Sequence, residues 1–234
     1  SRFGTALGVG LLPNQVDLNL GIVKFPVKTR VGAGPFPTEF GGRFSEDYCA
    51  KGLAHDIRFE LTQAGIPFTE DEQGVHYDTA HQNIIKLINS EDQFTKGMGI
   101  RLAGWEYGAT TGRPRRTGWT DLVALKHAIK VNGPDLVLTK ADILRFASEI
   151  RLATSYTVNG REVNPNFAHA DELCAVNGFD YASFKGFDED ISGMRTVRDL
   201  PSGLRESIDF LESFTGGNVR MISIGADRYD TIVV

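Results

Sequence analysis

The chain has 234 residues, of which 41% are hydrophobic and 24% are charged, so it can bury one sizeable core, or one core and a smaller lobe. Its 25 Lys and Arg residues against 30 Asp and Glu residues leave a formal charge of −5. Because binding to a phosphate backbone depends on an excess of positive charge, this balance makes nucleic acid a poor choice of partner.

Cysteine usage and hydropathy indicate the compartment. Only Cys49 and Cys174 are present, far apart and with no Cys or His at ligand spacing beside them, so neither a disulfide framework nor a structural zinc site is expected. No apolar run reaches the roughly 20 residues of a membrane-spanning helix. The first residues lack the basic, apolar and cleavage regions of a signal peptide. We therefore expect a cytoplasmic protein with no membrane partner.

The first part of the chain predicts a strand, a shaped loop and two helices. Residues 1–13 are rich in Gly and predict a loop, and the apolar residues from position 14 onward predict a helix that leads into a strand ending at Pro26. The stretch KTRVGAGPFPTEFGG (28–42) combines basic residues, glycines and prolines, which predicts a loop that lines a site. Helices are expected over 45–64 and 79–89, with an irregular polar stretch between them.

Helices alternate with short apolar strands in the second half, which predicts an α/β sheet that binds ligands at the carboxyl ends of its strands. The predicted helices lie over 119–131, 141–148 and 202–215. The predicted strands lie over 136–138, 151–157, 219–225 and 230–234. Asn159-Gly160 predicts a tight hairpin turn, and residues 164–195 are expected to be mostly loop and edge structure.

The stretch DLVLTKAD (135–142) places Lys140 and Asp142 just beyond a buried strand. A carboxylate there can accept hydrogen bonds from the N1–H and 2-amino groups of guanine, while the methylene stem of the lysine covers the ring. Ser223 and Gly225 follow a second strand and can present backbone N–H groups to O6 of the same base. The alternative is a surface helix start in which Asp142 is a capping acid. The chain contains no G-x-x-x-x-G-K-[ST] phosphate loop, so either another segment binds the phosphates or no triphosphate is used.

Three arginines follow a glycine–threonine stretch in EYGATTGRPRRTGW (106–119). In an extended segment Arg113 and Arg115 point to one side and Arg116 to the other, and two guanidinium groups on one face suit a dicarboxylate or a phosphate. The threonine hydroxyls and adjacent amides would complete an anion-binding nest. A solvated basic turn is the alternative reading of this segment.

Other polar residues are weaker candidates. His76, Asp78 and His81 are close in the sequence, but so sparse a set rarely binds metal, and no metal site is expected in this chain. Glu39 either faces a site or caps the segment that follows it.

The sequence resembles adenylosuccinate synthetase in four blocks, TRVGAGPFPTE (29–39), EYGATTGRPRRTGWTDLVAL (106–125), LTKADIL (138–144) and ISIGADRYDTI (222–232). The resemblance covers only the C-terminal part of that enzyme, without its phosphate loop, catalytic residues or magnesium site. It implies an α/β fold with a P-loop-NTPase-like mixed sheet flanked by helices. The implied regions are a central-sheet and nucleotide-loop segment (1–44), a helical insertion (45–105) and an aspartate-loop and guanine-binding region (106–234).

The resemblance also implies a two-step ligase reaction. GTP phosphorylates O6 of inosine monophosphate (IMP), and the amine of L-aspartate then displaces that phosphate to give adenylosuccinate, in the biosynthesis of AMP. The implied cofactors are GTP and Mg2+, with the metal ligands and the catalytic residues outside this chain, which alone would be inactive. The intact enzyme is expected to be a homodimer.

The site residues implied by the resemblance fall into two sets. The substrate-binding set is Arg30, Val31, Ala109, Thr110, Thr111, Gly112, Arg113, Pro114 and Arg115. The GTP-binding set is Arg115, Lys140, Ala141, Asp142, Ser223, Ile224 and Gly225. Residues 40–105 are longer than the link found in compact bacterial members, which predicts a surface elaboration. Two alternatives remain, a non-catalytic purine-nucleotide-binding module derived from the family and a relative that acts on another purine monophosphate.

Overall fold

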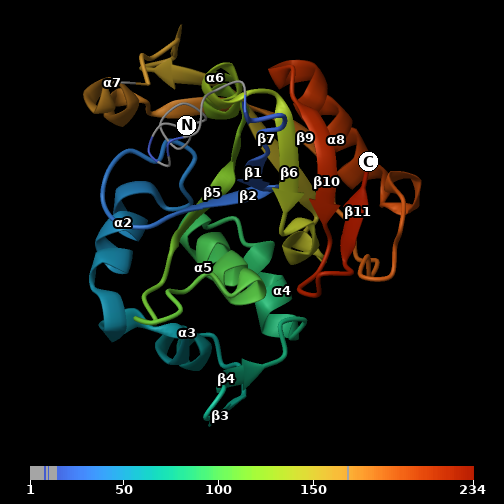
Figure 1. The fold of residues 1–234 in the computed structure, drawn as a ribbon. Coiled ribbons are helices and arrows are strands. Elements are labelled where there is room, and N and C mark those ends of the chain that lie inside the picture. Colours follow the sequence, from blue (N-terminus) through green and yellow to red (C-terminus); the bar gives the residue numbers. More distant parts are fainter. Residues whose placement is uncertain (1–7, 9, 11–14, 168) are drawn as a thin grey trace.

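The computed structural model describes residues 8, 10, 15–167 and 169–234, and its first sheet joins strands that are far apart in the sequence (Figure 1). The strand order is β1 (Gly21–Lys24), β6 (Asp135–Thr139), β10 (Asn218–Ser223) and β11 (Thr231–Val233). The first three strands are parallel, and β11 runs antiparallel to β10. Lys24 pairs in register with Thr139, so the carboxyl ends of the parallel strands meet at one edge of the sheet.

A second sheet begins directly after β1. It contains β2 (Val27–Arg30), β5 (Arg116–Asp121), β7 (Glu149–Val158), β8 (Arg161–Val163) and β9 (Gly178–Lys185). Strand β5 pairs antiparallel with β2 and parallel with β7, which also pairs antiparallel with β8 and β9. The register places Arg30 opposite Arg116, which brings the start of the glycine-rich loop after β2 beside the arginine segment.

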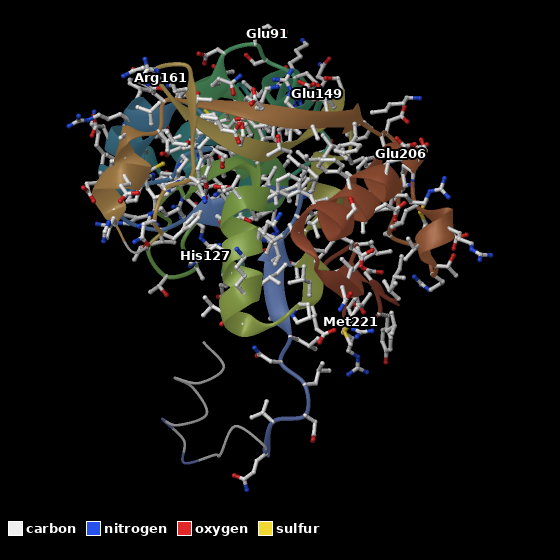
Figure 2. The ribbon with its side chains drawn as sticks, turned by 90° about the horizontal axis from the view of Figure 1, so that it is seen from above. Glu91, His127, Glu149, Arg161, Glu206 and Met221 are labelled. Atoms are coloured by element: carbon white, nitrogen blue, oxygen red, sulfur yellow. The ribbon has the colours of Figure 1, made fainter. Side chains whose placement is uncertain are left out.

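Two long helices hold the sheets together. Helix α6 (Leu122–Asn132) packs against α8 (Ser202–Thr215) and β7, and α8 contacts β7 and β9 of one sheet and β10 of the other. His127 marks α6 and Glu206 marks α8 in Figure 2. The buried residues of α8 lie on one stripe that includes Leu204, Ile208 and Leu211, which explains why the helical period of this segment is plain in the sequence.

Residues 42–104 fold as helices around one hairpin. The elements are α2 (Gly42–Ala50), η2 (Gly52–His55), α3 (Ile57–Gln63), β3 (Phe68–Asp71), β4 (Gly74–Tyr77), α4 (Gln82–Ile88) and α5 (Gln93–Gly104). Leu61 and Ile100 from this region belong to the same hydrophobic cluster as Leu138 and Ile208. The region is therefore part of the core, and the expected surface elaboration describes only its hairpin, in which every residue of β3 is exposed.

The remaining elements are short and lie in the connections between strands and helices. They are η3 (Ala141–Leu144), α7 (Ala170–Ala175) and η4 (Val197–Asp199). None of the helices in the described part of the chain is long and apolar enough to cross a membrane.

Several expected elements differ in the structure. The helix expected over 45–64 is broken, because Gly52 has a φ of 63° and the side chain of Asp56 caps a new helix by accepting from the Phe59 amide. The polar stretch after it is the β3–β4 hairpin. Residues 16–20 form no helix before β1, and the loop expected at 1–13 lies largely outside the described residues.

Three differences concern the second half. Trp119 belongs to β5 and not to a helix, because the apolar residues that continue the helical pattern begin only at Leu122. The helix expected over 141–148 is a single 3-10 turn that ends at Leu144, and Phe146 adopts a positive φ of 72°. Residues 164–195 contain β9, an eight-residue strand paired along β7.

Helix α5 was missed altogether by the sequence patterns. It contains Gly97, Gly99 and Gly104, which dilute its apolar period. A Cβ atom at Gly99 would lie 2.6 Å from the backbone nitrogen of Ile88, so this glycine permits the close packing of α4 against α5. Gly99 is needed because the two helices contact each other at this position. No pattern in the local sequence shows that need.

Candidate functional site

A cavity of about 490 Å³, here called the arginine groove, lies between the end of β2, helix α2 and the loop before β5. Its lining residues are Arg30, Val31, Gly32, Ala33, Glu46, Cys49, Ala50, Gly108, Ala109, Thr110, Thr111, Arg113, Pro114, Arg115 and Arg116. Two segments that are separated by about eighty positions, and were both singled out in the sequence, therefore face one cavity. Of the nine residues in the expected substrate-binding set, only Gly112 does not line it.

The loop between Gly108 and Arg113 is closed by backbone hydrogen bonds. The Gly108 amide donates to the Arg113 carbonyl at 2.8 Å, and the Gly112 amide donates to the Gly108 carbonyl at 2.8 Å. Gly112 has a φ of 62°, which turns the chain at this position. The loop exposes Ala109, Thr110 and Thr111 at the cavity, so its threonine hydroxyls are available to a ligand.

The three arginines of the segment have different surroundings. Arg113 and Arg115 both line the groove, and so does Arg116, which the extended pattern placed on the other side. The Arg116 side chain is 4% exposed and donates to Glu39 through Nε and Nη2, while its Nη1 donates to the carbonyls of Gly32 and Gly34. Arg116 is thus an internal brace of the glycine-rich loop, and Glu39 is its partner.

A second cavity, of about 180 Å³, lies at the carboxyl edge of the first sheet and is here called the strand-end pocket. Its lining residues are Lys24, Thr139, Lys140, Asp142, Ser223, Gly225 and Ala226. The parallel strands β1, β6 and β10 end together, so their terminal side chains converge on this space. Four of the expected GTP-binding residues, Lys140, Asp142, Ser223 and Gly225, meet here.

Lys140 and Asp142 are placed by the turn that follows β6. Lys140 has a positive φ of 68°, and its Nζ donates to the carbonyl of Gly104 at 2.7 Å at the end of α5. The Asp142 side chain is partly buried, and this burial raises the pKa of its carboxyl group above the usual value. A partly desolvated carboxylate at a strand end is well suited to accept hydrogen bonds from a base.

The remaining members of the GTP-binding set, Ala141, Ile224 and Arg115, do not line the strand-end pocket. Ala141 is fully buried in the core. Ile224 is also fully buried, and its amide donates to the Asp230 carbonyl at 2.8 Å. Arg115 lies in the arginine groove and not in the strand-end pocket.

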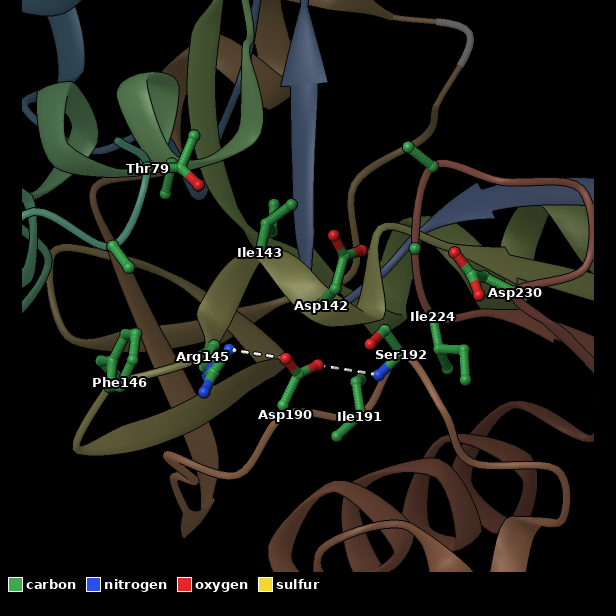
Figure 3. Close-up of a pocket in the computed structure, with 14 residues that line it drawn as sticks. Thr79, Asp142, Ile143, Arg145, Phe146, Asp190, Ile191, Ser192, Ile224 and Asp230 are labelled. Carbon is green, nitrogen blue, oxygen red and sulfur yellow. Dashed lines mark hydrogen bonds and ion pairs between the residues drawn. The ribbon is translucent and has the colours of Figure 1, made fainter. Parts of the chain in front are cut away.

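A third cavity of about 280 Å³ adjoins the strand-end pocket and shares Asp142 and Gly225 with it. Figure 3 shows Asp142 and Asp230 on one side and the ion pair of Arg145 with Asp190 on the other. The Nη1 of Arg145 lies 3.1 Å from the carboxylate of Asp190. Asp142 is thus accessible from two sides, which leaves room for a planar ring beside it.

One buried carboxylate bonds a residue of the arginine groove and a residue of the strand-end pocket. The Glu106 side chain is 0% exposed and accepts from Nζ of Lys24 at 2.7 Å and from Nη1 of Arg115 at 3.0 Å. Lys24 lines the strand-end pocket and Arg115 lines the groove, so Glu106 is bonded to one lining residue of each cavity. A ligand with anionic groups in both would cross this cluster.

Comparisons with known proteins show the family of the chain. A sequence profile described as adenylosuccinate synthetase matches residues 2–232. The chain belongs to the adenylosuccinate synthetase family. The expected family is thereby confirmed.

Relatives of the synthetase family match along almost the whole chain. The adenylosuccinate synthetase of Moorella thermoacetica is 34% identical over 234 residues, which are 99% of this chain and 42% of that protein. That of Caldanaerobacter subterraneus subsp. tengcongensis is 32% identical over 232 residues, with the same two shares. The chain therefore spans less than half the length of these curated relatives.

A solved structure shows the same fold. The fully ligated adenylosuccinate synthetase from Plasmodium falciparum superposes with a TM-score of 0.68 and 24% sequence identity, over 99% of this chain and 43% of that chain. The expected α/β fold with mixed sheets flanked by helices is therefore confirmed as part of the synthetase fold.

Sequence reasoning missed Lys24 and Glu106 in this synthetase chain. Lys24 is the last residue of β1, directly after the apolar Ile22 and Val23, and a charged residue at that place signals a strand end that faces ligand. Glu106 carried no such signal, because its burial depends on Lys24 and Arg115. Among the described residues no group of three or more His, Cys, Asp and Glu side chains could hold a metal ion, and His76 instead pairs with Asp71.

Proposed function

We propose that this chain forms the part of a GTP-dependent ligase that recognises L-aspartate and guanine. The whole enzyme joins L-aspartate to IMP to form adenylosuccinate in the biosynthesis of AMP, with GDP and phosphate as the other products. The observation that carries the proposal is the position of Glu106, whose carboxylate bonds both Arg115 of the arginine groove and Lys24 of the strand-end pocket.

In the arginine groove, Arg113 and Arg115 bind oxyanions of the substrates. Each guanidinium can bind a carboxylate or a phosphate through two parallel hydrogen bonds, and the exposed Thr110 and Thr111 hydroxyls add further donors. L-Aspartate carries two carboxylates, and this loop suits it. Arg30 and Val31, on the opposite wall, line the ribose of IMP.

In the strand-end pocket, Asp142 accepts hydrogen bonds from N1–H and the 2-amino group of guanine. Adenine lacks both of these donors in that arrangement, so the carboxylate selects GTP over ATP. The stem of Lys140 lies along the ring, and the amides of Ser223 and Gly225 face O6. Ala141 and Ile224, which are fully buried, support this pocket without touching the base.

Magnesium does not enter the proposed roles of these residues. The described part of the chain offers no cluster of ligands that fits the ion, so no step of the mechanism is assigned to it here. The Mg2+ expected for the family needs carboxylate and phosphate oxygens that other groups provide. The proposed roles of this chain are binding and orientation of aspartate, IMP and GTP.

The test uses the natural polypeptide that carries this chain. Purified protein is assayed for adenylosuccinate formed from IMP and L-aspartate with GTP, and with ATP in its place. We expect turnover with GTP only, and an increase of about tenfold or more in the KM of aspartate for Arg113→Ala. Absence of ligation with GTP and every common purine monophosphate would contradict the ligase proposal.

The same assay separates the two alternatives. Turnover with a different purine monophosphate would identify a relative with another substrate. Binding of GDP without any turnover would identify a non-catalytic nucleotide-binding module. We also propose that the intact enzyme is a cytoplasmic homodimer, which light scattering and cell fractionation can test.

A further inference from the structure

The Lys24–Glu106–Arg115 cluster, in which only Arg115 was assigned a role from the sequence, is organised around one buried carboxylate. Glu106 accepts from Nζ of Lys24 at 2.8 Å through Oε1 and at 2.7 Å through Oε2, and from Nη1 of Arg115 at 3.0 Å. The Glu106 side chain is 0% exposed, while Lys24 and Arg115 are 29% and 31% exposed. The carboxylate is internal and both cations reach toward a cavity.

The ammonium group of Lys24 has no hydrogen to spare for a ligand. Besides its two bonds to Glu106, Nζ donates to Oγ1 of Thr29 at 2.9 Å. An ammonium has three donors, so all three are used inside the protein. Lys24 thus acts on a ligand through its charge and not through a direct hydrogen bond.

Arg115, in contrast, retains unused donors. One nitrogen bonds to Glu106, and its Nε is buried without a hydrogen-bond partner in the structure. A buried guanidinium donor without a partner costs free energy, and an oxyanion in the groove can satisfy it. The backbone amide of Arg115 also donates to the Glu106 carbonyl at 2.8 Å, so the two residues are fixed to each other twice.

The charges of the cluster do not cancel. A pair of Glu106 and Arg115 alone would be neutral and would attract an anion weakly. Lys24 neutralises Glu106, so the cluster carries a net charge of about +1, and that charge is exposed to the groove through Arg115.

We propose that Lys24 and Glu106 are positioning residues, in which Glu106 orients the guanidinium of Arg115 and Lys24 offsets the charge of Glu106 so that Arg115 stays fully attractive to a substrate oxyanion. This inference rests on the proposed function for the identity of the substrates. The oxyanion is a carboxylate or a phosphate, and the experiment distinguishes them. No direct contact between Lys24 and the substrate is required.

The test compares four forms of the natural polypeptide that differ in the net charge of the cluster or in the residue that supplies it. Wild type has a cluster charge of +1, Lys24→Met has 0, and Lys24→Met combined with Glu106→Gln returns it to +1. The KM values of aspartate, IMP and GTP are measured for each, together with kcat. We expect Lys24→Met to raise the KM of one of them about tenfold or more with a smaller change in kcat, and the double variant to recover most of this loss.

Lys24→Arg, the fourth form, keeps the charge and should stay close to wild type. Whichever substrate responds identifies the oxyanion, a carboxylate for aspartate or a phosphate for IMP or GTP. A double variant no better than Lys24→Met would overturn the charge argument, because a purely structural role predicts added damage when Glu106 also changes.

Lys28→Met is the matched control. Nζ of Lys28 bonds a buried carboxylate, Asp121, at 2.9 Å and is 28% exposed, but this pair does not touch Arg115. The Lys28→Met variant should lose a similar ion pair without the increase in KM expected for Lys24→Met. Equal KM changes in both methionine variants would also overturn the inference.

A second measurement does not depend on turnover. The side-chain Nε–H resonance of Arg115 is followed by NMR during titration of this chain with inorganic phosphate and, separately, with L-aspartate. We expect a shift in wild type that is lost in Lys24→Met and regained in the double variant. If these shifts are seen in a protein without ligase activity, the proposed function is contradicted and the inference stands. If an active ligase shows no effect of Lys24→Met, the inference is contradicted and the proposed function stands.

Discussion

Glu39 and Arg116 form a two-armed ion pair inside the chain, with Nε of Arg116 2.9 Å from one carboxylate oxygen of Glu39 and Nη2 2.6 Å from the other. The side chains are 2% and 4% exposed. Because Nη1 of Arg116 also donates to the carbonyls of Gly32 and Gly34, the pair ties β5 to the loop that borders the arginine groove. The shape of this wall therefore depends on a contact buried away from any ligand.

Glu39→Gln is expected to lower the free energy of unfolding by about 3 kcal/mol, because the buried guanidinium of Arg116 then keeps only the more distant and partly exposed carboxylate of Glu46, at 3.2 Å, as its counter-charge. Urea denaturation measures the change. Arg220→Gln serves as the control, because its pair with Asp135 is more than half exposed on the arginine side and should contribute less than about 1 kcal/mol. Equal losses for the two variants would contradict the assignment of Arg116 as an internal brace.

Asp142→Ala is expected to weaken the binding of GDP by about tenfold to a hundredfold, because a carboxylate that bonds two donors of one base contributes about 1–3 kcal/mol to discrimination. Isothermal titration calorimetry with GDP and ADP measures it. Asp190→Ala, whose side chain lies across the adjoining cavity and pairs with Arg145, should leave GDP binding within about threefold. A loss of GDP affinity in the Asp190 variant alone would indicate that the base binds on the Asp190 side of that cavity.

Asp142→Asn is expected to stabilise the ligand-free chain at pH 7. Burial raises the folded-state pKa of Asp142 above its unfolded value of 3.8, so proton binding favours the folded state. The stabilising contribution of Asp142 is full below pH 3.8 and is lost as the pH rises through the raised pKa. The gain from asparagine should therefore shrink as the pH falls from 7 towards 4, as measured by urea denaturation across that range. A gain that is constant with pH would show that ionisation is not its cause.

Gly203→Ala is expected to destabilise the chain by about 2 kcal/mol or more. A Cβ atom at Gly203 would overlap the carbonyl oxygen of Lys185, so the start of α8 would have to move away from β9. Gly193→Ala is the control, since nothing lies within 4 Å of a Cβ atom there. The melting temperatures of the two variants compare them directly, and similar values would contradict the close contact of α8 with β9.

Local patterns predicted the elements whose residues interact mainly with their own neighbours in sequence. The helix over 202–215 was predicted to the residue, because its apolar stripe and the glycine at its end are both local features. The hairpin at Asn159-Gly160 was predicted for the same reason. Helix α5 was not, because its glycines dilute the apolar period and are explained only by tertiary contacts, such as that of Gly99 with α4.

The sequence by itself determined the family, the segment that brings Arg113 and Arg115 to the groove, and the strand ends that hold Lys140, Asp142, Ser223 and Gly225. Only the tertiary structure decided that the Arg116 side chain is buried against Glu39 and that Lys24, at the strand-end pocket, is bonded to Glu106. Lys24 and Glu106 are 82 positions apart, and Arg116 and Glu39 are 77 apart. No periodic or motif signal links such residues, because a charge becomes a partner only when the folding of two sheets buries a carboxylate beside it and removes the water that would otherwise solvate both.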